Sequence, residues 1–280
     1  MTTVCLSFDF DGLAIWLSTF KQVTPTALSR GEYGARVGLE RVLAVLAAQR
    51  VPATFFVPAH TASSFPAAAA RIATLGHEIA AHGFIHESPV GLSRAEEEDL
   101  LGRSEQVLER VTGARPRGYR SPAWDLSPHT IELLEGRGYL YDSSLMADDF
   151  RPFRPRKHDR VTEQGLTPGP HSSLVEFPVA WELDDYPYFH FASRPYNAGL
   201  RNPEDVLAIW TAEFDYCHAQ VPDGVFTLTM HPEIIGRGPR IQILDRLIGH
   251  MRDTAGVAFA TMSEQAAQLR QGALAGRDEH

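Results

Sequence analysis

Cysteine is scarce in this chain, and neither cysteine has a second one near it in the sequence. Cys5 lies in an apolar run and Cys217 in a segment of helical periodicity, and neither belongs to a Cys-x-x-Cys pair. Two isolated cysteines exclude a disulfide framework and a thiolate zinc site. The apolar surroundings of Cys5 also argue against a catalytic nucleophile, because a reactive thiolate needs polar, electropositive neighbours.

The chain also lacks an excess of positive charge and long apolar stretches. It carries 26 Lys and Arg against 35 Asp and Glu, which gives a formal net charge of -9. A nucleic-acid partner is not expected, because such binding needs clustered cations. No run of about 18 apolar residues is present, so no membrane span is expected. The first residues, 1–4, lack the basic and apolar regions of a secretory signal, and we expect a cytoplasmic protein.

What the chain does have is a regular alternation of strand-like and helix-like segments. Apolar runs predict strands over 4–10, 53–57, 77–81, 118–120, 139–142, 174–179, 225–230 and 257–260. Helical spacing predicts helices over 38–49, 67–75, 93–111, 127–136, 202–218, 241–251 and 263–269. Ser93 and Glu96 form a capping-box pattern at the start of the clearest helix. The alternation predicts an α/β fold with a mainly parallel sheet, open or closed into a barrel. We expect one domain over 1–270 and a flexible tail over 271–280.

Residues 147–200 interrupt this alternation. The stretch is rich in Pro, Arg and Asp, and it holds a group of aromatic residues: Trp181, Tyr186, Tyr188, Phe189 and Phe191. That many aromatic residues argue against disorder. Long excursions within a compact domain are commonly functional. We interpret the stretch as an elaborated loop region that could close over a small pocket.

Two acids follow the first predicted strand. Catalytic side chains in folds of this type lie at the carboxyl ends of the strands. Here the strand ends in Asp9-Phe10-Asp11-Gly12. Residues at i and i+2 of an extended chain share a face, so both carboxylates could enter one cleft. Taken alone, the segment is also compatible with an ordinary acidic turn.

Two histidines follow the third predicted strand. His82 and His86 can face one ion if the segment forms a helical turn, although one packed and one solvated histidine would give the same spacing. Together with Asp11 they supply one carboxylate and two imidazoles, a ligand set that suits a catalytic zinc or another divalent transition metal. Asp9 would then remain beside the metal as a candidate general base. We predict one divalent metal ion per chain, with zinc favoured.

Other strand ends carry further candidate groups. Arg120 could hold Asp9 ionised and oriented, with a surface ion pair as the alternative. Trp124 could form an apolar wall of the site or pack in the core. His231 follows the strand at 225–230 and is a candidate general acid, because the amine that leaves in amide hydrolysis must be protonated.

In this order, these segments resemble the polysaccharide deacetylase family, also called carbohydrate esterase family four, over roughly residues 1–265. The resemblance matches Asp9 to the catalytic base and His231 to the general acid. It matches Asp11, His82 and His86 to the metal ligands. It implies a distorted, incomplete (β/α) barrel with mainly parallel strands.

The third motif of that family is matched by Arg120-Ser121-Pro122-Ala123-Trp124. The resemblance therefore makes Arg120 a catalytic residue and makes Ser121 and Trp124 candidate substrate-binding residues. It implies hydrolysis of an amide bond, in a glycan or in a small molecule.

The chain departs from the family pattern in several places. Phe10 is inserted between the two aspartates, and Gly83 stands where a hydroxyl residue is usual. The fourth motif of the family carries an acid that pairs with the last histidine, and three aspartates compete for that role: Asp142, Asp148 and Asp149. The departures resemble a divergent branch with peptidoglycan deacetylase-like and allantoinase-like or cyclic-imide hydrolases, whose members tend to be homo-oligomers.

The sequence thus leaves three functions open. The first is metal-dependent N-deacetylation of a polysaccharide or peptidoglycan, and the second is hydrolysis of a small cyclic amide, imide or ureide. The third is a non-catalytic binding module on the same scaffold. The aromatic stretch favours the small substrate, because it could close a small pocket. The presence of every catalytic and metal-ligand candidate argues against the binding module, because a decayed site would have lost at least one of them.

Overall fold

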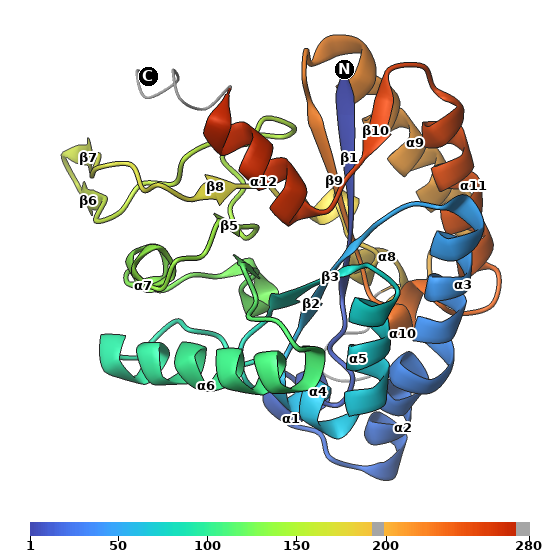
Figure 1. Cartoon of the computed structure of the whole chain (residues 1–280), viewed down its shortest axis with the longest axis horizontal. Coiled ribbons are helices and arrows are strands. Elements are labelled where there is room, and N and C mark those ends of the chain that lie inside the picture. Colours follow the sequence, from blue (N-terminus) through green and yellow to red (C-terminus); the bar gives the residue numbers. More distant parts are fainter. Residues whose placement is uncertain (192–198, 273–280) are drawn as a thin grey trace.

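The protein is described by a computed structural model, which covers residues 1–191 and 199–272. Strands and helices alternate along most of this length (Figure 1). The strands are β1 (Thr2–Asp9), β2 (Thr54–Val57), β3 (Glu78–Ala81), β4 (Gly118–Tyr119), β5 (Tyr141–Asp142), β6 (Arg160–Thr162), β7 (Gly165–Thr167), β8 (Val175–Glu176), β9 (Val225–Met230) and β10 (Val257–Phe259).

Within the described residues, eight of these strands form one sheet in the order β10-β1-β2-β3-β4-β5-β8, with β9 paired to β1. Every pairing in this sheet is parallel. β9 runs along β1 from Thr3 to Phe8, whereas β10 pairs with the start of β1 and β2 with its end. β1 is therefore the centre of a curled sheet that forms a half-barrel, which confirms the expected α/β fold with mainly parallel strands.

Helices cover both faces of the sheet, and Figure 1 shows α3, α5, α9 and α11 on one side of β1 and α12 on the other. The α-helices are α1 (Ala14–Ser18), α2 (Pro25–Tyr33), α3 (Leu39–Gln49), α4 (Ala59–Ser64), α5 (Pro66–Thr74), α6 (Arg94–Thr112), α7 (Thr130–Gly136), α8 (Tyr186–Phe189), α9 (Pro203–Gln220), α10 (Pro232–Ile235), α11 (Arg240–Asp253) and α12 (Met262–Gln271). A π-helix, η1 (Gly34–Gly38), joins α2 to α3, and two 3-10 turns are η2 (Pro122–Trp124) and η3 (Trp181–Leu183).

The alternation of side chains along β1 separates two apolar cores. Leu6 and Phe8 pack in the larger core beneath α3 and α11, with residues such as Leu43 and Leu247. Cys5 points to the other face, into a smaller core that α12 closes with Met262. Odd-numbered residues of β1 face this second core. Asp9, the last residue of β1, belongs to the same row, so its side chain also faces the inside of the curled sheet.

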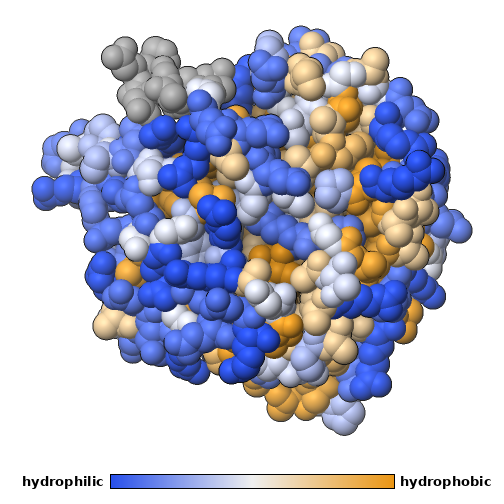
Figure 2. Space-filling model, viewed as in Figure 1, coloured by the Kyte–Doolittle hydropathy of each residue, from blue (hydrophilic) through white to orange (hydrophobic). Residues whose placement is uncertain are grey.

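Regular elements match the sequence predictions to within a few residues, and the differences are local. The structure adds helices that the periodicity did not predict, among them α1, α2, α4 and η1. The irregular stretch contains the exposed β6–β7 hairpin, the short strand β8, η3 and α8. In the view of Figure 2, hydrophilic residues dominate over α6 and this hairpin, and more apolar residues reach the surface on the opposite side.

Two further expectations have limited structural counterparts. Part of the predicted flexible tail lies outside the described residues, because α12 extends to Gln271 and residues 273–280 are not described. Among the described helices, none is long and apolar enough to cross a membrane.

Candidate metal centre and active site

The carboxyl end of β1 brings two aspartates to one place. Cys5, Ser7 and Asp9 share a face of the strand, and all three side chains are buried. Past the end of β1, the Phe10 amide still donates to the Phe56 carbonyl of the β2 strand at 2.8 Å, so the chain stays extended as far as Asp11. Both carboxylates therefore enter the same cavity, as the i, i+2 spacing predicts.

The histidine segment does not form the helical turn that its spacing suggested. Residues 82–87 form a loop of bends in which Gly83 and His86 take positive φ angles of 70° and 64°. The Glu87 carboxylate accepts a hydrogen bond from the Phe84 amide at 3.0 Å and another from the next amide along the chain. A side chain thus replaces the backbone carbonyl that a helix would use, and the expectation of a helical turn was wrong.

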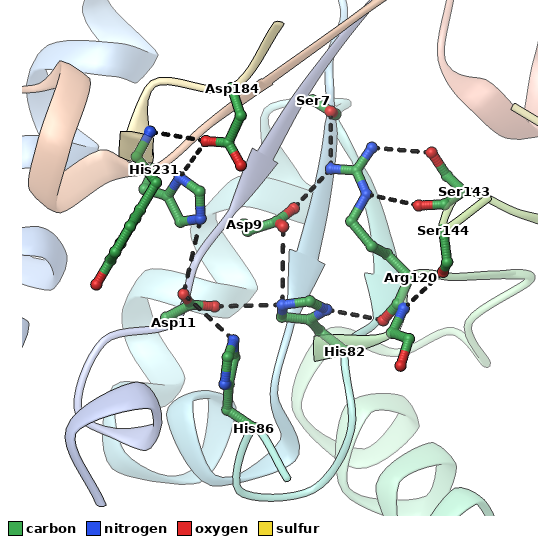
Figure 3. A network of polar contacts seen from close by, with 12 residues as sticks. Ser7, Asp9, Asp11, His82, His86, Arg120, Ser143, Ser144, Asp184 and His231 are labelled. Atoms are coloured by element: carbon green, nitrogen blue, oxygen red, sulfur yellow. Dashed lines mark hydrogen bonds and ion pairs between the residues drawn. The ribbon is translucent and has the colours of Figure 1, made fainter. Parts of the chain in front are cut away.

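The loop nevertheless brings both imidazoles to Asp11 (Figure 3). The Nε2 atom of His82 lies 3.4 Å from one carboxylate oxygen of Asp11, and the Nε2 of His86 lies 3.6 Å from the other. The opposite ring nitrogens are engaged, since the Nδ1 of His82 lies 2.7 Å from the Arg120 carbonyl and the Nδ1 of His86 lies 2.7 Å from the Thr19 hydroxyl. Because a carbonyl only accepts, the Nδ1 of His82 carries the proton, which leaves its Nε2 lone pair free for a metal ion.

The protonation of these three residues also suits a metal ion. Burial lowers the pKa of His82, and it lowers the pKa of His86 to about 4, so both rings are neutral near neutral pH. Burial raises the pKa of Asp11 to about 6. Both carboxylate oxygens of Asp11 are buried and accept no hydrogen bond from any described residue. A buried carboxylate without a donor is costly unless a cation binds it, so the donor set fits a divalent metal ion.

Asp9 has a different partner. One of its oxygens lies 2.7 Å from the Nη1 atom of Arg120, and the other lies 3.7 Å from the Nε2 of His82. Burial alone raises the pKa of a carboxyl group, but here Arg120 and His82 outweigh it and hold the pKa of Asp9 below its usual value. Arg120 is buried, so the surface ion pair considered as its alternative is excluded. The structure brings Asp9 and Arg120 together as the sequence predicts.

His231 follows β9 and lies beside a pair of aspartates. Its backbone amide donates to Asp185 at 3.0 Å, and its Nδ1 donates to the same carboxylate at 2.7 Å. Its Nε2 points toward Asp11, with 3.8 Å between the two atoms. Burial lowers the pKa of a histidine, but the Asp185 and Asp184 carboxylates outweigh it and hold the pKa of His231 well above its usual value. A ring that stays protonated at neutral pH can donate a proton.

The acid that pairs with His231 is therefore Asp185, and none of the three aspartates proposed from the sequence takes this role. Asp142 instead contacts Glu176, Asp148 caps a turn by accepting from two backbone amides, and Asp149 is exposed. The partner was missed because it lies in the irregular stretch, far along the chain from those candidates. The acidic doublet beside the aromatic residues was the signal that could have identified it.

A cavity of about 540 Å³ lies over these residues. Its polar lining comes from Asp9, Asp11, Asp184, His82, His86 and His231, and its remaining wall is largely aromatic, from Phe20, Trp124, Trp181, Tyr186 and His190. The rings of Trp124 and Trp181 stack with their centroids 4.3 Å apart. Two segments far apart in the sequence thus form one aromatic wall.

The two predicted substrate-binding residues have different places. Trp124 lines the cavity as expected. Ser121 does not line it, because its buried hydroxyl donates to the Asp125 carbonyl and its amide donates to Ser144. Ser121 fixes the turn that carries Ala123 and Trp124, both of which have a φ of 56°.

Comparisons with known proteins agree with this geometry. The sequence profile described as polysaccharide deacetylase matches residues 31–141. The peptidoglycan deacetylase of Helicobacter pylori is 33% identical over 274 residues, which cover 93% of this chain and 94% of that protein. A Mycobacterium smegmatis structure, assigned to a polysaccharide deacetylase, is 36% identical, with a TM-score of 0.85 over 96% of this chain and 90% of that one.

A more distant likeness concerns the fold alone. The Puue allantoinase structure has a TM-score of 0.78 and 21% identity, and the alignment covers 100% of this chain and 92% of that one. Sequence identity to the Helicobacter pylori protein over nearly the whole chain, together with the buried Asp-His-His cluster, is decisive for the family. The chain belongs to the polysaccharide deacetylase family and is a hydrolase of carbon–nitrogen bonds other than peptide bonds.

Proposed function

We propose that this protein removes the N-acetyl group from amino-sugar residues of a peptidoglycan-type glycan, with one zinc ion held by Asp11, His82 and His86. The observation that carries the proposal is the buried Asp11 carboxylate, whose two oxygens lie near the Nε2 atoms of His82 and His86 and accept no hydrogen bond from the described residues. The relationship to a peptidoglycan deacetylase supports the substrate class.

The proton acceptor, the proton donor and the metal ligands of the cavity then have separate tasks. A divalent cation supplies Lewis acidity when bound, which activates water and polarises the amide carbonyl. Asp9, kept ionised by Arg120, accepts the proton of the attacking water. His231, kept protonated by Asp185, donates a proton to the departing amine nitrogen. The products are acetate and the free amino sugar.

The aromatic wall provides the binding surface for the sugar. Trp124 lies on one side of the cavity and stacks on Trp181, which is 47% exposed. Aromatic rings bury large areas at low entropic cost, and the apolar face of a pyranose ring packs well on them. We propose that this pair orients the sugar so that its acetamido group reaches Asp9 and His231.

A second candidate is hydrolysis of a small cyclic amide, imide or ureide. The observation in its favour is the size of the cavity, about 540 Å³ with walls supplied by residues 181–190, which suits a small molecule. The same general base and general acid would serve ring opening. The two substrate classes differ in size. The neighbouring sugars of a glycan must extend out of the cavity past Trp181, whereas a small cyclic amide fits inside it.

The deciding experiment compares both substrate classes on zinc-loaded protein. Acetate release is measured from N-acetylated peptidoglycan fragments, and ring opening is followed by absorbance for a panel of cyclic imides and ureides. Metal content is measured in parallel for wild type and His82→Ala. Acetate release that is lost in Asp9→Asn supports the deacetylase, whereas turnover of only the cyclic amides supports the alternative.

If protein that carries one zinc per chain turns over no substrate of the two panels, both enzymatic proposals are contradicted and the binding module remains.

Two further predictions concern the whole protein, its location in the cytoplasm and its assembly into a homo-oligomer. Cell fractionation and light scattering of the purified protein check them.

A further inference from the structure

Arg120 is held from two opposite sides. Its Nη1 atom donates to Asp9 at 2.7 Å and to the Ser7 hydroxyl at 3.0 Å. On the far side, its Nε donates to the Ser143 carbonyl at 3.0 Å and its Nη2 donates to the Ser143 hydroxyl at 2.9 Å. The guanidinium also lies over the ring of Phe56, 4.1 Å from its centroid. The position of Ser143 therefore affects the orientation of Asp9 through Arg120.

Ser143 begins a short turn, residues 143–145, that two buried carboxyl groups hold in place. One oxygen of Glu176, Oε1, accepts hydrogen bonds from the amides of Ser144 and Leu145, both at 2.8 Å. One oxygen of Asp142, Oδ1, accepts from the Ser144 hydroxyl at 2.9 Å. That hydroxyl in turn accepts from the amide of Ser121, the residue after Arg120, so the turn is tied back to the arginine.

The other two oxygens of these carboxyl groups have no donor. Asp142 and Glu176 are directly opposite each other on the parallel strands β5 and β8, and neither side chain is exposed. Asp142 Oδ2 and Glu176 Oε2 are buried and meet no N–H or O–H group among the described residues. The two carboxyl groups contact each other. A single proton between Oδ2 and Oε2 satisfies both oxygens and removes one of two adjacent buried charges.

We propose that Asp142 and Glu176 share one proton and act as a positioning pair, which holds the 143–145 turn and through it fixes Arg120 and Asp9. The pair touches neither the cavity nor the candidate metal ligands, so its role is indirect. The inference rests on the proposed function for its consequence in catalysis, although the shared proton itself does not.

The electrostatic surroundings favour the singly protonated pair. Burial raises the pKa of Asp142 to about 6, and burial together with the Asp142 carboxylate raises the pKa of Glu176 well above its usual range. The chief charged neighbour is Arg120, which favours one negative charge on Asp142 but is already paired with Asp9. The neighbouring phenol of Tyr119 is kept neutral by burial, which raises its pKa. If Asp142 and Glu176 were both ionised, their two negative charges and that of Asp9 would therefore share one cation, Arg120.

Amide variants test the pair because a single amide places one donor group between the two side chains, as the shared proton does, whereas the double amide does not. Glu176→Gln keeps an Oε1 acceptor for the turn and offers an N–H₂ group to Asp142, and Asp142→Asn does the same in reverse. The double amide Asp142→Asn/Glu176→Gln places two donor groups face to face, with nearly the same volume. Glu97→Gln is a matched control, because Glu97 is also buried and accepts from the hydroxyls of Ser127 and Thr130 rather than from Arg120 or the 143–145 turn.

The first measurement needs neither substrate nor metal. Infrared difference spectra at pH 7 of wild type against each single amide are expected to show the carbonyl stretch of one protonated carboxylic acid, lost in Glu176→Gln and in Asp142→Asn and retained in Glu97→Gln. Persistence of this band in both single amides would overturn the shared proton, whatever the enzyme acts on.

The second measurement is acetate release from N-acetylated peptidoglycan fragments by zinc-loaded protein. The double amide is expected to lose at least about tenfold in kcat with little change in KM or zinc content, and either single amide is expected to restore kcat to within about threefold of wild type. Wild type is expected to lose activity at alkaline pH sooner than Glu176→Gln, which has no shared proton to release. Equal kcat and pH profiles in all variants would overturn the positioning role. No acetate release by wild type would count against the proposed function alone, because the infrared result would stand.

Discussion

Asp9 and Asp11 show how neighbouring residues of one type acquire different tasks. Both are buried aspartates at the end of β1, two positions apart. Arg120 neutralises Asp9 directly and keeps its pKa low, whereas burial raises the pKa of Asp11 to about 6 although His231 lies 3.8 Å from it. Carboxyl groups whose environments push their pKa values apart can take different roles, which supports our proposal of Asp9 as the proton acceptor and Asp11 as a metal ligand.

Replacement of each aspartate should separate these roles. Asp9→Asn is expected to lower kcat by a factor of about 10² to 10⁴, the usual contribution of a general base, with the zinc content unchanged. Asp11→Asn is expected to lose the zinc itself. Metal analysis beside steady-state kinetics of the two variants makes the comparison. Equal loss of zinc in both would show that Asp9 is a ligand rather than the base.

The partner of His231 gives a second prediction at this scale. Asp185→Asn removes the negative charge that keeps the His231 ring protonated, and kcat is expected to fall about 100-fold while KM and zinc content stay the same. Asp148→Asn serves as the control, because Asp148 only caps a turn. If Asp148→Asn and Asp185→Asn have the same kcat, the pairing with His231 has no part in proton donation.

At the scale of elements, the start of α6 is determined by residues that are neighbours in the sequence. The Ser93 hydroxyl accepts from the Glu96 amide, and the Glu96 carboxylate accepts from the Ser93 amide at 2.8 Å, which is the capping box that the sequence predicts. Ser93→Ala is expected to lower the free energy of unfolding by about 1 kcal/mol, because the first turn loses its cap. Chemical denaturation measures it.

The same substitution elsewhere provides the control. Ser29 is exposed within α2 and donates only to a carbonyl of its own helix, so Ser29→Ala is expected to leave stability unchanged or slightly higher. An equal loss of stability in both variants would contradict the capping explanation. Neither change should alter zinc content.

Elements defined by neighbours in the sequence could be predicted, and those defined by distant contacts could not. The strand at 225–230 was predicted with its observed bounds because it is a continuous apolar run. The π-helix η1 was missed, since its Gly34 and Gly38 are required by close contact with Glu233 and Pro232, about 200 residues later. The His82–His86 loop was misread for a related reason, because a side chain rather than the backbone closes it.

For the molecule as a whole, stability should depend on pH through the buried carboxyl pair. Burial and the adjacent Asp142 carboxylate raise the pKa of Glu176 well above its usual value, so the folded state holds a proton at pH values where the unfolded state has released it. An acid with a raised pKa stabilises the fold fully below the unfolded value, and this contribution is lost as pH rises through the folded one. The loss amounts to about 1.4 kcal/mol for each pKa unit by which the folded value exceeds the unfolded one.

Relative to that of Glu176→Gln, whose amide donates at every pH, the unfolding free energy of wild type is therefore expected to fall as the pH rises above 4.5, the usual pKa of a glutamate, and to continue falling beyond pH 7. Denaturant titrations of zinc-loaded wild type and variant at several pH values measure the difference. Carboxyl groups elsewhere contribute equally to both proteins and cancel. Parallel curves would show that the pair does not exchange its proton over this range.

The sequence also predicted the core of the site better than its boundary. The parallel sheet brings together the strand ends at which six predicted residues lie, namely Asp9, Asp11, His82, His86, Arg120 and His231. The cavity wall could not be assembled in this way. Trp181 and Asp185 lie in a stretch whose path depends on contacts such as the bridge between Asp184 and Thr229, which no local pattern encodes.

The central place of β1 has a consequence for how the protein is made. β1 leaves the ribosome before the other strands of this sheet, yet the Ser7 hydroxyl donates a hydrogen bond to the carbonyl of Leu228, 221 residues later. One edge of β1 stays unpaired until β9 is synthesised, and part of its other edge stays unpaired until β10 is synthesised. The proposed metal ligands are therefore all synthesised long before β9 and β10 can pair with β1. Folding that depends on such distant pairings is slow, and a nascent chain stalled before residue 225 would carry Asp11, His82 and His86 on an unfinished sheet.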